Sequence, residues 1–217
     1  MIGVFGGTFD PIHFGHLRPA LDVHQALGLD ELRFLPLNSA VHRAQPVASA
    51  AQRLAMVQAA LAGEPGLRAD DRELARAGPS YTVDTLHSLR QELGPRRSIC
   101  LLVGGDTFNA FLDWHRPFDI LALAHLVVMQ RPGAAAPDDP ALRAELACRG
   151  TRQLAALRQA PAGRIWIESV TQLDISATRI RGLFAAGRSP RYLLPDAVLE
   201  LARREACYSA QRGHDAA

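Results

Sequence analysis

Short apolar segments that recur between helical patterns constrain the fold of this chain more than any other feature. The segments Ile99–Val103 and Leu126–Met129 are apolar at every position. Such strands are typical of a parallel sheet that helices cover on both faces. Further short strands are predicted at Ile2–Phe5, Leu32–Leu35 and Ile165–Ile167. Their alternation with helices predicts an α/β fold, a Rossmann-like doubly wound and mostly parallel sheet with helices on both faces.

Helical patterns fill the intervals between these strands. The apolar residues that mark them are Leu17, Ala20, Leu21 and Leu27, then Leu54, Val57 and Leu61, then Leu86, Leu89 and Leu93. Ser49 is the predicted cap of the second helix, and Gly94 ends the third. Because Pro19 has no backbone N–H, it is harmless only in a first turn, so the first helix is predicted to begin near Gly15–His16.

The domain organisation follows from the absence of any recognisable linker or internal repeat. A single domain is predicted over residues 1–217. Residues 131–164 are rich in Ala, Pro and Arg and weakly patterned, which indicates an irregular, partly helical excursion between two strands. The polar tail after residue 208 is expected to fray.

Composition excludes several function classes. The basic side chains of the Lys and Arg type number 24, and all are Arg because the chain contains no Lys. A P-loop, a Schiff-base lysine and a lysine general base are therefore excluded. The formal net charge is only +2, so no nucleic-acid partner is expected.

Cysteine usage and hydropathy predict a cytoplasmic protein without a membrane partner. Cys100, Cys148 and Cys207 are scattered, which favours reduced thiols over a disulfide framework or a zinc site. No signal peptide and no bilayer-spanning apolar run is recognisable. The sequence is compatible with a homo-oligomer and does not decide the oligomeric state.

A glycine-rich stretch, GGTFDPIHFGHL, directly follows the first predicted strand. A loop at the carboxyl end of a parallel strand is where such folds bind nucleotides. Gly6 and Gly7 let backbone N–H groups approach an anion, and the helix that follows offers its positive end to phosphate. The stretch is neither a G-x-G-x-x-G loop nor a Walker A loop. Instead, His13 and His16 can donate hydrogen bonds to phosphate oxygens.

Two other interpretations of this histidine pair stay open at this point. The pair could cap the loop structurally, or it could bind a metal. Zinc is the poorer reading, because a tetrahedral site needs three or four ligands and no Cys/His cluster accompanies the pair. The position between a Gly-rich strand exit and a helix start favours phosphate contact.

A second candidate motif, LDISATRIRGLF, lies far downstream. Ser176 is a plausible N-cap, and Ile175 with Ile180 fits a hydrophobic staple. The simplest reading is a well-capped amphipathic helix. However, Ser176, Thr178 and Arg181 also place two hydroxyls and a guanidinium at a positive helix end, which suits a second phosphate contact.

The two motifs together resemble the H-x-G-H and I-S-x-T-x-x-R signature of the nucleotidyltransferase superfamily. Within it, the segments SYTVDTL and GGDTF with the following Trp are similar to those of bacterial nicotinate-nucleotide adenylyltransferases. The resemblance covers nearly the whole chain apart from the Ala/Pro-rich excursion. It implies transfer of the adenylyl group of ATP to nicotinate mononucleotide, which gives deamido-NAD and pyrophosphate in NAD biosynthesis.

The resemblance also implies ATP contacts from both motifs. The residues concerned are Gly6, Gly7, Thr8, Phe9, His13, His16, Ser176, Thr178 and Arg181. Of these, His13, His16 and Arg181 are implied to be catalytic, by positioning and charge neutralisation without a covalent nucleophile. Mg²⁺ is expected on the ATP phosphates, with no protein ligand assigned.

The resemblance places acceptor recognition elsewhere. Thr82 and the backbone at His115 would bind the nicotinate carboxylate, and Trp114 would stack on the pyridine ring. Core filling is the ordinary role of a lone Trp, but the polar context DWHRP favours stacking. Asp106, after a strand, could hold a ribose hydroxyl. Arg131, at the end of another strand, could meet a phosphate, although a solvated surface Arg is the plainer reading.

One loop departs from the family pattern. His42 and Arg43 keep the donors expected to face the mononucleotide phosphate, but residues 40–41 are Ala-Val where the family commonly has two prolines. A looser loop and a higher mononucleotide KM are predicted. Two alternatives stay open: a sister enzyme acting on nicotinamide mononucleotide or phosphopantetheine, or with CTP on an alcohol phosphate, and a non-catalytic nucleotide sensor.

Overall fold

The predicted strands assemble side by side in the computed structural model, which describes residues 1–38, 45–76, 78, 80–131, 133 and 136–208. Over these residues the sheet has six strands in the order β3-β2-β1-β4-β5-β6, and every pairing is parallel. Their bounds are β1 (Ile2–Gly7), β2 (Glu31–Pro36), β3 (Leu67–Ala69), β4 (Ile99–Gly104), β5 (His125–Gln130) and β6 (Ile165–Ser169). This order is that of the Rossmann-type doubly wound sheet, so the predicted fold class is confirmed.

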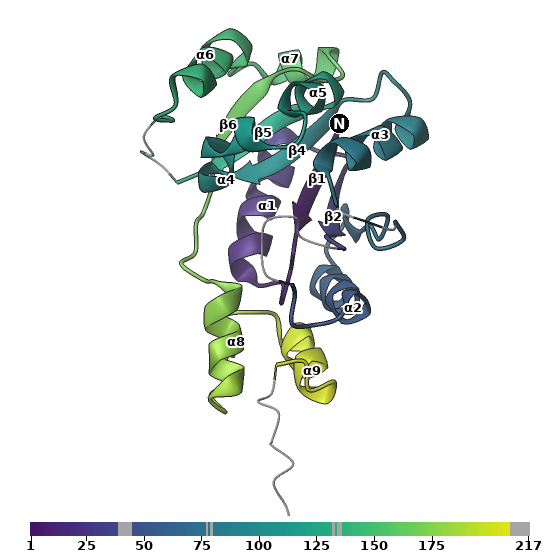
Figure 1. Cartoon of the computed structure of the whole chain (residues 1–217), viewed down its shortest axis with the longest axis vertical. Helices are drawn as coiled ribbons and strands as arrows, with labels where there is room; N and C mark the ends of the chain where they lie inside the picture. Colours follow the sequence, from purple (N-terminus) through teal and green to yellow (C-terminus); the bar gives the residue numbers. More distant parts are fainter. Residues whose placement is uncertain (39–44, 77, 79, 132, 134–135, 209–217) are drawn as a thin grey trace, which may run out of the picture.

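Helices connect the strands and cover both faces of the sheet (Figure 1). They are α1 (Phe14–Leu27), α2 (Ala50–Leu61), α3 (Thr82–Leu93), α4 (Gly105–Asn109), α5 (Pro117–Leu123), α6 (Pro140–Arg149), α7 (Leu154–Gln159), α8 (Ala177–Ala185) and α9 (Asp196–Arg204), with a 3₁₀ turn, η1 (Phe111–Asp113). Helices α8 and α9 lie together at one end of the molecule, where α9 packs against α2. No helix among the described residues is long and apolar enough to span a bilayer.

The sheet separates two hydrophobic cores, because successive side chains of a strand point to opposite faces. Along β4, Cys100 and Leu102 enter the first core, while Leu101 and Val103 enter the second. The first core also takes side chains from α1, α2, α8 and α9, and the second from α3, α5 and η1. Burial on both faces explains why these strands are continuously apolar.

Local signals placed most helix ends correctly. Ser49 caps α2 in a capping box with Gln52, as its hydroxyl accepts from the Gln52 N–H at 3.2 Å. Gly94 ends α3. The predicted buried face of α2 needs correction, because Arg53 is fully buried there and Leu54 only partly.

The predicted start of α1, near Gly15–His16, was correct to within one or two residues, but Pro19 does not lie in the first turn as expected. The helix begins at Phe14, with His13 as its N-cap, so Pro19 lies in the second turn. A proline there has no N–H to give to the carbonyl of Gly15, four residues back. The Pro19 side chain is buried in this position.

Two segments complete the comparison with the predictions. Strand β3, only three residues long, was not predicted, because Leu67-Arg68-Ala69 has no apolar run. Helices α6 and α7 occupy much of the segment 131–164. Residues 39–44, which carry His42 and Arg43, and residues 209–217 lie outside the described part of the chain.

Candidate active site

The loop after β1 is shaped by a buried phenylalanine. Phe9 adopts a left-handed φ of 48°, which is uncommon for a bulky residue, and its ring is buried. The ring packs on Gly7, where a Cβ atom would come within 2.7 Å of it. At Gly6, by contrast, a Cβ atom would meet nothing within 4 Å. Gly7 is therefore required for packing, whereas Gly6 borders open space with its backbone exposed.

His13 and His16 lie side by side at the start of α1. Their rings stack with centroids 3.8 Å apart, and the Phe9 ring meets His16 edge-on at 5.2 Å. Both Nδ1 atoms are buried and have no hydrogen-bond partner among the described residues. The His13 carbonyl accepts from the backbone of His16 at 2.8 Å, which fixes the spacing of the pair.

Both imidazoles are neutral in the free protein at pH 7. Burial lowers the pKa of His13 to about 4. Burial, together with the neighbouring His13, lowers the pKa of His16 to about 3. A phosphate placed beside these rings would favour their protonated form and offset that cost. The pair is thus suited to hydrogen bonding with an anion that brings its own negative charge.

The second motif reaches the same loop. Arg181 of α8 donates from Nη1 to the carbonyl oxygen of Asp10 at 2.7 Å, and its Nη2 lies 3.4 Å from Thr178 Oγ1. A Cβ atom at Gly15 would lie 3.0 Å from the His13 ring and 3.1 Å from the Ile175 carbonyl oxygen. The glycine of H-x-G-H therefore lets the segment before α8 approach the loop.

Ser176 caps α8, as predicted, by accepting from the backbone N–H of Arg179 at 3.2 Å. Ile180 is buried, and Ile175 packs partly buried in the same core, as the staple pattern indicated. The structure thus joins residues more than 150 positions apart in one place. We call these residues the two-motif cluster: His13, His16, Ser176, Thr178 and Arg181.

Two buried charged side chains that hold this loop were missed. The Asp10 carboxylate accepts from the amides of Val47 at 2.8 Å and Ala48 at 3.0 Å, and from the Tyr208 hydroxyl at 2.8 Å. Arg53 donates to the carbonyl oxygens of Thr8 at 2.9 Å and Leu37 at 2.7 Å. A signal for Arg53 was present, because it shares the apolar stripe of α2 with Val57 and Leu61 at helical spacing.

A second set of candidate residues gathers around the start of α3. The ring of Tyr81, the N-cap of α3, lies 4.4 Å from that of His115. Thr82 is the first residue of α3, whose first N–H groups have no partner within the helix. Trp114 is half-buried and packs on Phe111 at 5.8 Å. We call Tyr81, Thr82, Trp114 and His115 the Tyr81–Trp114 group.

A buried carboxylate, Glu73, contacts the first turns of α3 and was also missed. Glu73 accepts from the Thr85 hydroxyl at 2.7 Å, while its Oε2 atom is buried without a partner among the described residues. Burial raises the pKa of Glu73. The neighbouring Asn38 N–H donates to Ser80 Oγ at 3.2 Å, which ties the end of β2 to the segment before α3.

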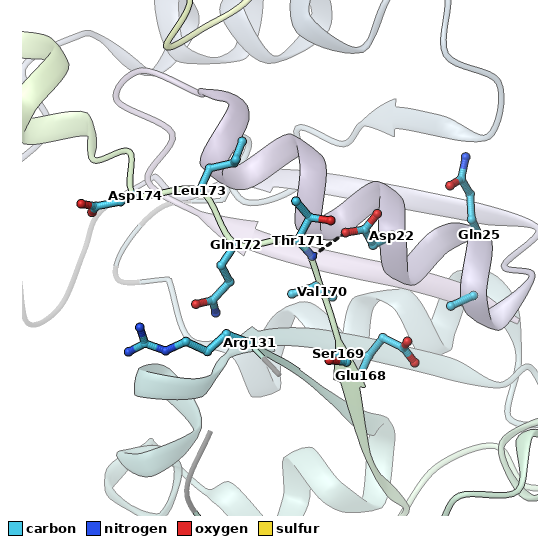
Figure 2. Close-up of a pocket in the computed structure, with 11 residues that line it drawn as sticks. Asp22, Gln25, Arg131, Glu168, Ser169, Val170, Thr171, Gln172, Leu173 and Asp174 are labelled. Carbon is cyan, nitrogen blue, oxygen red and sulfur yellow. Dashed lines mark hydrogen bonds between the residues drawn. The ribbon is translucent and has the colours of Figure 1, made fainter. Parts of the chain in front are cut away.

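Arg131 and Asp106 make no hydrogen bond or ring contact with the described residues of the two-motif cluster or of the Tyr81–Trp114 group. Arg131 is exposed on the wall of an open hollow of about 1200 Å³, opposite residues 168–174, which lead into α8. Figure 2 shows Thr171 on this segment bonded to Asp22 of α1, at 2.7 Å. Asp106, in the first turn of α4, is exposed, and its carboxylate accepts no hydrogen bond from the described residues.

The protein side chains do not form a metal cage in the described part of the chain. No group of three or more His, Cys, Asp or Glu residues is arranged there to hold an ion. The carboxylate of the two-motif loop, Asp10, is already engaged by two amides and a hydroxyl.

Comparison with known proteins identifies the family of this chain. Residues 4–183 match the cytidylyltransferase-like family. A curated protein of Aeromonas salmonicida, named "Probable nicotinate-nucleotide adenylyltransferase", is 50% identical over 210 residues, which cover 96% of this chain and 97% of that protein. A protein of the same name from Halorhodospira halophila is 51% identical over 197 residues, covering 91% and 90% of the two chains.

Solved structures show the same fold at much lower identity. The Plasmodium falciparum nicotinic acid mononucleotide adenylyltransferase complexed with NaAD superposes with a TM-score of 0.70 at 15% identity, over 95% of this chain and 96% of that chain. The same enzyme complexed with APC gives a TM-score of 0.67 at 14% identity, with the same coverage. From its motifs, its fold and its relatives, this chain belongs to the nicotinate-nucleotide adenylyltransferase family of cytidylyltransferase-like proteins.

Proposed function

We infer that this protein transfers the adenylyl group of ATP to nicotinate mononucleotide, releasing pyrophosphate and forming deamido-NAD in NAD biosynthesis. One observation carries the inference beyond family membership. Arg181 reaches across to the loop after β1 and bonds the Asp10 carbonyl at 2.7 Å, so that both signature motifs face one place. The β1–β4 boundary, where strand order reverses, is where such sheets bind nucleotides.

The two-motif cluster supports binding of the triphosphate. It combines two imidazoles, two hydroxyls and a guanidinium at the start of two helices, α1 and α8, whose N-terminal ends favour negative charge. The exposed backbone at Gly6 adds room for close approach. The hollow beside Arg131 offers space for the nucleoside half of ATP next to the segment that leads into Ser176.

The Tyr81–Trp114 group supports recognition of the acceptor. A nicotinate carboxylate carries a negative charge, which the free N–H groups at the start of α3 favour over the neutral amide of nicotinamide. The half-buried Trp114 offers a ring for stacking, and Asp106 offers a free carboxylate to a ribose hydroxyl. His42 and Arg43, outside the described residues, are proposed to meet the acceptor phosphate.

In the proposed step, a 5′-phosphate oxygen of the mononucleotide attacks the α-phosphorus of ATP in line. The new P–O bond forms as the bond to the pyrophosphate oxygen breaks. His13, His16 and Arg181 stabilise the negative charge that passes to the leaving group, and the rest of the site brings two mutually repelling phosphates together. Mg²⁺ supplies further charge neutralisation on the phosphates when bound.

The free thiols Cys100, Cys148 and Cys207 fit the proposed cytoplasmic location.

A coupled assay with ATP tests this function. Nicotinate and nicotinamide mononucleotide are supplied at equal concentration, with CTP as the alternative nucleotide. We expect product from ATP and nicotinate mononucleotide, with a kcat/KM at least about tenfold above that for nicotinamide mononucleotide. Equal or reversed preference would contradict the assignment, and ATP binding without turnover would favour a nucleotide sensor.

A further inference from the structure

The last described residue, Tyr208, contacts the active-site loop although it lies near the far end of the chain. Its hydroxyl donates to Asp10 Oδ1 at 2.8 Å, and its ring packs against Phe184 of α8 at 5.5 Å. The side chain is buried, with 5% exposed. Burial, together with the nearby charge of Asp10, raises the pKa of Tyr208, so the hydroxyl keeps its proton and acts as the donor.

The Asp10 carboxylate stands between competing cations. Its Oδ2 atom lies 3.8 Å from Arg181 Nη1, too far for a hydrogen bond, and the charge of Arg53 also acts on it. The amides of Val47 and Ala48 and the Tyr208 hydroxyl instead take up the carboxylate oxygens. Arg181 therefore donates its hydrogen bond to the Asp10 carbonyl oxygen and none to the Asp10 carboxylate. The other guanidinium N–H groups are not engaged by Asp10.

We propose that Tyr208 is a positioning residue for adenylyl transfer, whose hydroxyl keeps the Asp10 carboxylate away from Arg181 and so leaves the guanidinium for the triphosphate. This proposal rests on the proposed function, because it takes Arg181 as an ATP ligand. Asp10 Oδ2 already forms a long ion pair with Arg181 at 3.8 Å; without the Tyr208 hydroxyl on Oδ1, only the Val47 and Ala48 amides hold the carboxylate, which can then turn closer to Arg181 and compete with the phosphates.

Removal of one oxygen atom tests the proposal. In Tyr208→Phe, we expect the KM for ATP to rise about fivefold to tenfold, while the KM for the mononucleotide changes less than about twofold. The matched control is Tyr192→Phe, which removes the same atom from a side chain that is 84% exposed. A Tyr208→Phe enzyme with an unchanged ATP KM, or with both KM values raised equally, would overturn the proposal.

A second variant tests the competing charge itself. Asn at position 10 cannot form an ion pair with Arg181, but its amide has one acceptor oxygen where the carboxylate uses two, so only the effect of Tyr208→Phe within the Asp10→Asn background is interpreted. In that background, adding Tyr208→Phe should change the ATP KM by less than about twofold. If Tyr208→Phe has the same effect in both backgrounds, the carboxylate is not the competitor and the proposal fails.

Binding measurements separate this inference from the proposed function. Calorimetry with α,β-methylene-ATP, an analogue that cannot be cleaved at the α-phosphorus, reports the dissociation constant without turnover. An inactive wild-type protein would refute the function, yet weaker analogue binding by Tyr208→Phe would still support the positioning role. An active wild type with equal analogue affinity in both proteins would refute the positioning role alone. Thermal midpoints of both proteins show that the folded forms are compared.

Discussion

The imidazole rings of His13 and His16 stack with their centroids 3.8 Å apart and their planes 30° from parallel. Two protonated rings could not share this place without strong repulsion, and burial already holds both in the neutral form. In the proposed site, the pair would therefore meet ATP as two neutral hydrogen-bonding groups. Positive charge can develop on them only as the phosphates supply a compensating charge.

Loss of His16 should affect chemistry more than binding. In His16→Ala we expect kcat to fall by about 10²-fold or more, with the mononucleotide KM changed less than about threefold, because the ring acts on charge that develops in the transition state. Steady-state kinetics with both substrates measures this split. His87→Ala, on the exposed side of α3, is the control. Retention of most of the kcat would refute the catalytic role of His16.

Acid should destabilise the protein through the same pair. The folded pKa values of about 4 and about 3 lie below the ordinary value of histidine, so the unfolded chain binds more protons than the folded one between pH 6.5 and 4. The free energy of unfolding therefore decreases as the pH is lowered through that window. We expect a slope of about 1 kcal/mol per pH unit for each ring, measured by urea unfolding. The double variant His13→Gln/His16→Gln should show a shallower slope, whereas His87→Gln should match the wild type.

Arg53 should be essential for the shape of the loop that follows β1. It is fully buried and bonds the carbonyl oxygens of Thr8, Leu37 and Ala48. A lysine cannot satisfy three carbonyls in that geometry, so Arg53→Lys should lower the free energy of unfolding by about 2–3 kcal/mol and raise the ATP KM. Arg68→Lys, at a side chain that is 62% exposed, should change neither quantity. Wild-type stability in Arg53→Lys would contradict this reading.

Glu73 should reduce stability at high pH. Burial raises the pKa of Glu73, so the folded protein keeps this carboxyl protonated at pH values where the unfolded chain has already lost the proton. The free energy of unfolding therefore decreases as the pH rises from about 4.5 through the pKa of the folded protein. Glu73→Gln keeps an acceptor for Thr85 and removes the charge. We expect it to be more stable than the wild type at pH 8 and equally stable at pH 4, by urea unfolding. The exposed Glu64→Gln is the control; a less stable Glu73→Gln at pH 8 would refute the prediction.

Trp114 should determine acceptor affinity without affecting ATP. In Trp114→Leu we expect the nicotinate mononucleotide KM to rise about tenfold, because a stacking surface is lost, with the ATP KM unchanged. Trp114→Phe should recover part of the loss. Phe118→Leu, at a nearby side chain that is 56% exposed, is the control. Equal increases in both KM values would indicate that Trp114 only supports the core.

Sequence reasoning predicted the fold because its signals were strong and local. Continuous apolar runs marked β4 and β5, and Ser49 and Ser176 marked the helix starts that they cap. Strand β3 has no such run, and it is held by its pairing with β2, a non-local contact. The start of α1 was predicted to within one or two residues, although Pro19 lies in the second turn and not in the first turn that its missing N–H suggested.

In the candidate site, too, local sequence signals identified some residues and missed others. Residues that would touch substrate stood out by motif, but those that hold the loops did not. Asp10 was visible only as part of the motif, and its partners Val47 and Tyr208 lie 37 and 198 positions away. Such long-range hydrogen bonds leave no periodic trace in a sequence, so the supporting roles of Asp10 and Glu73 became visible only in three dimensions, whereas Arg53 could have been noticed on the apolar stripe of α2.

The division of the sheet into two cores has a consequence for how such enzymes diverge. The helices that carry the two-motif cluster, α1 and α8, pack in the first core, whereas α3 and η1, which bear Thr82 and precede Trp114, pack in the second. Substitutions that accumulate on one face can therefore reshape acceptor choice while the nucleotide half stays intact. One scaffold could in this way give rise to enzymes with different acceptors and a shared nucleotide donor.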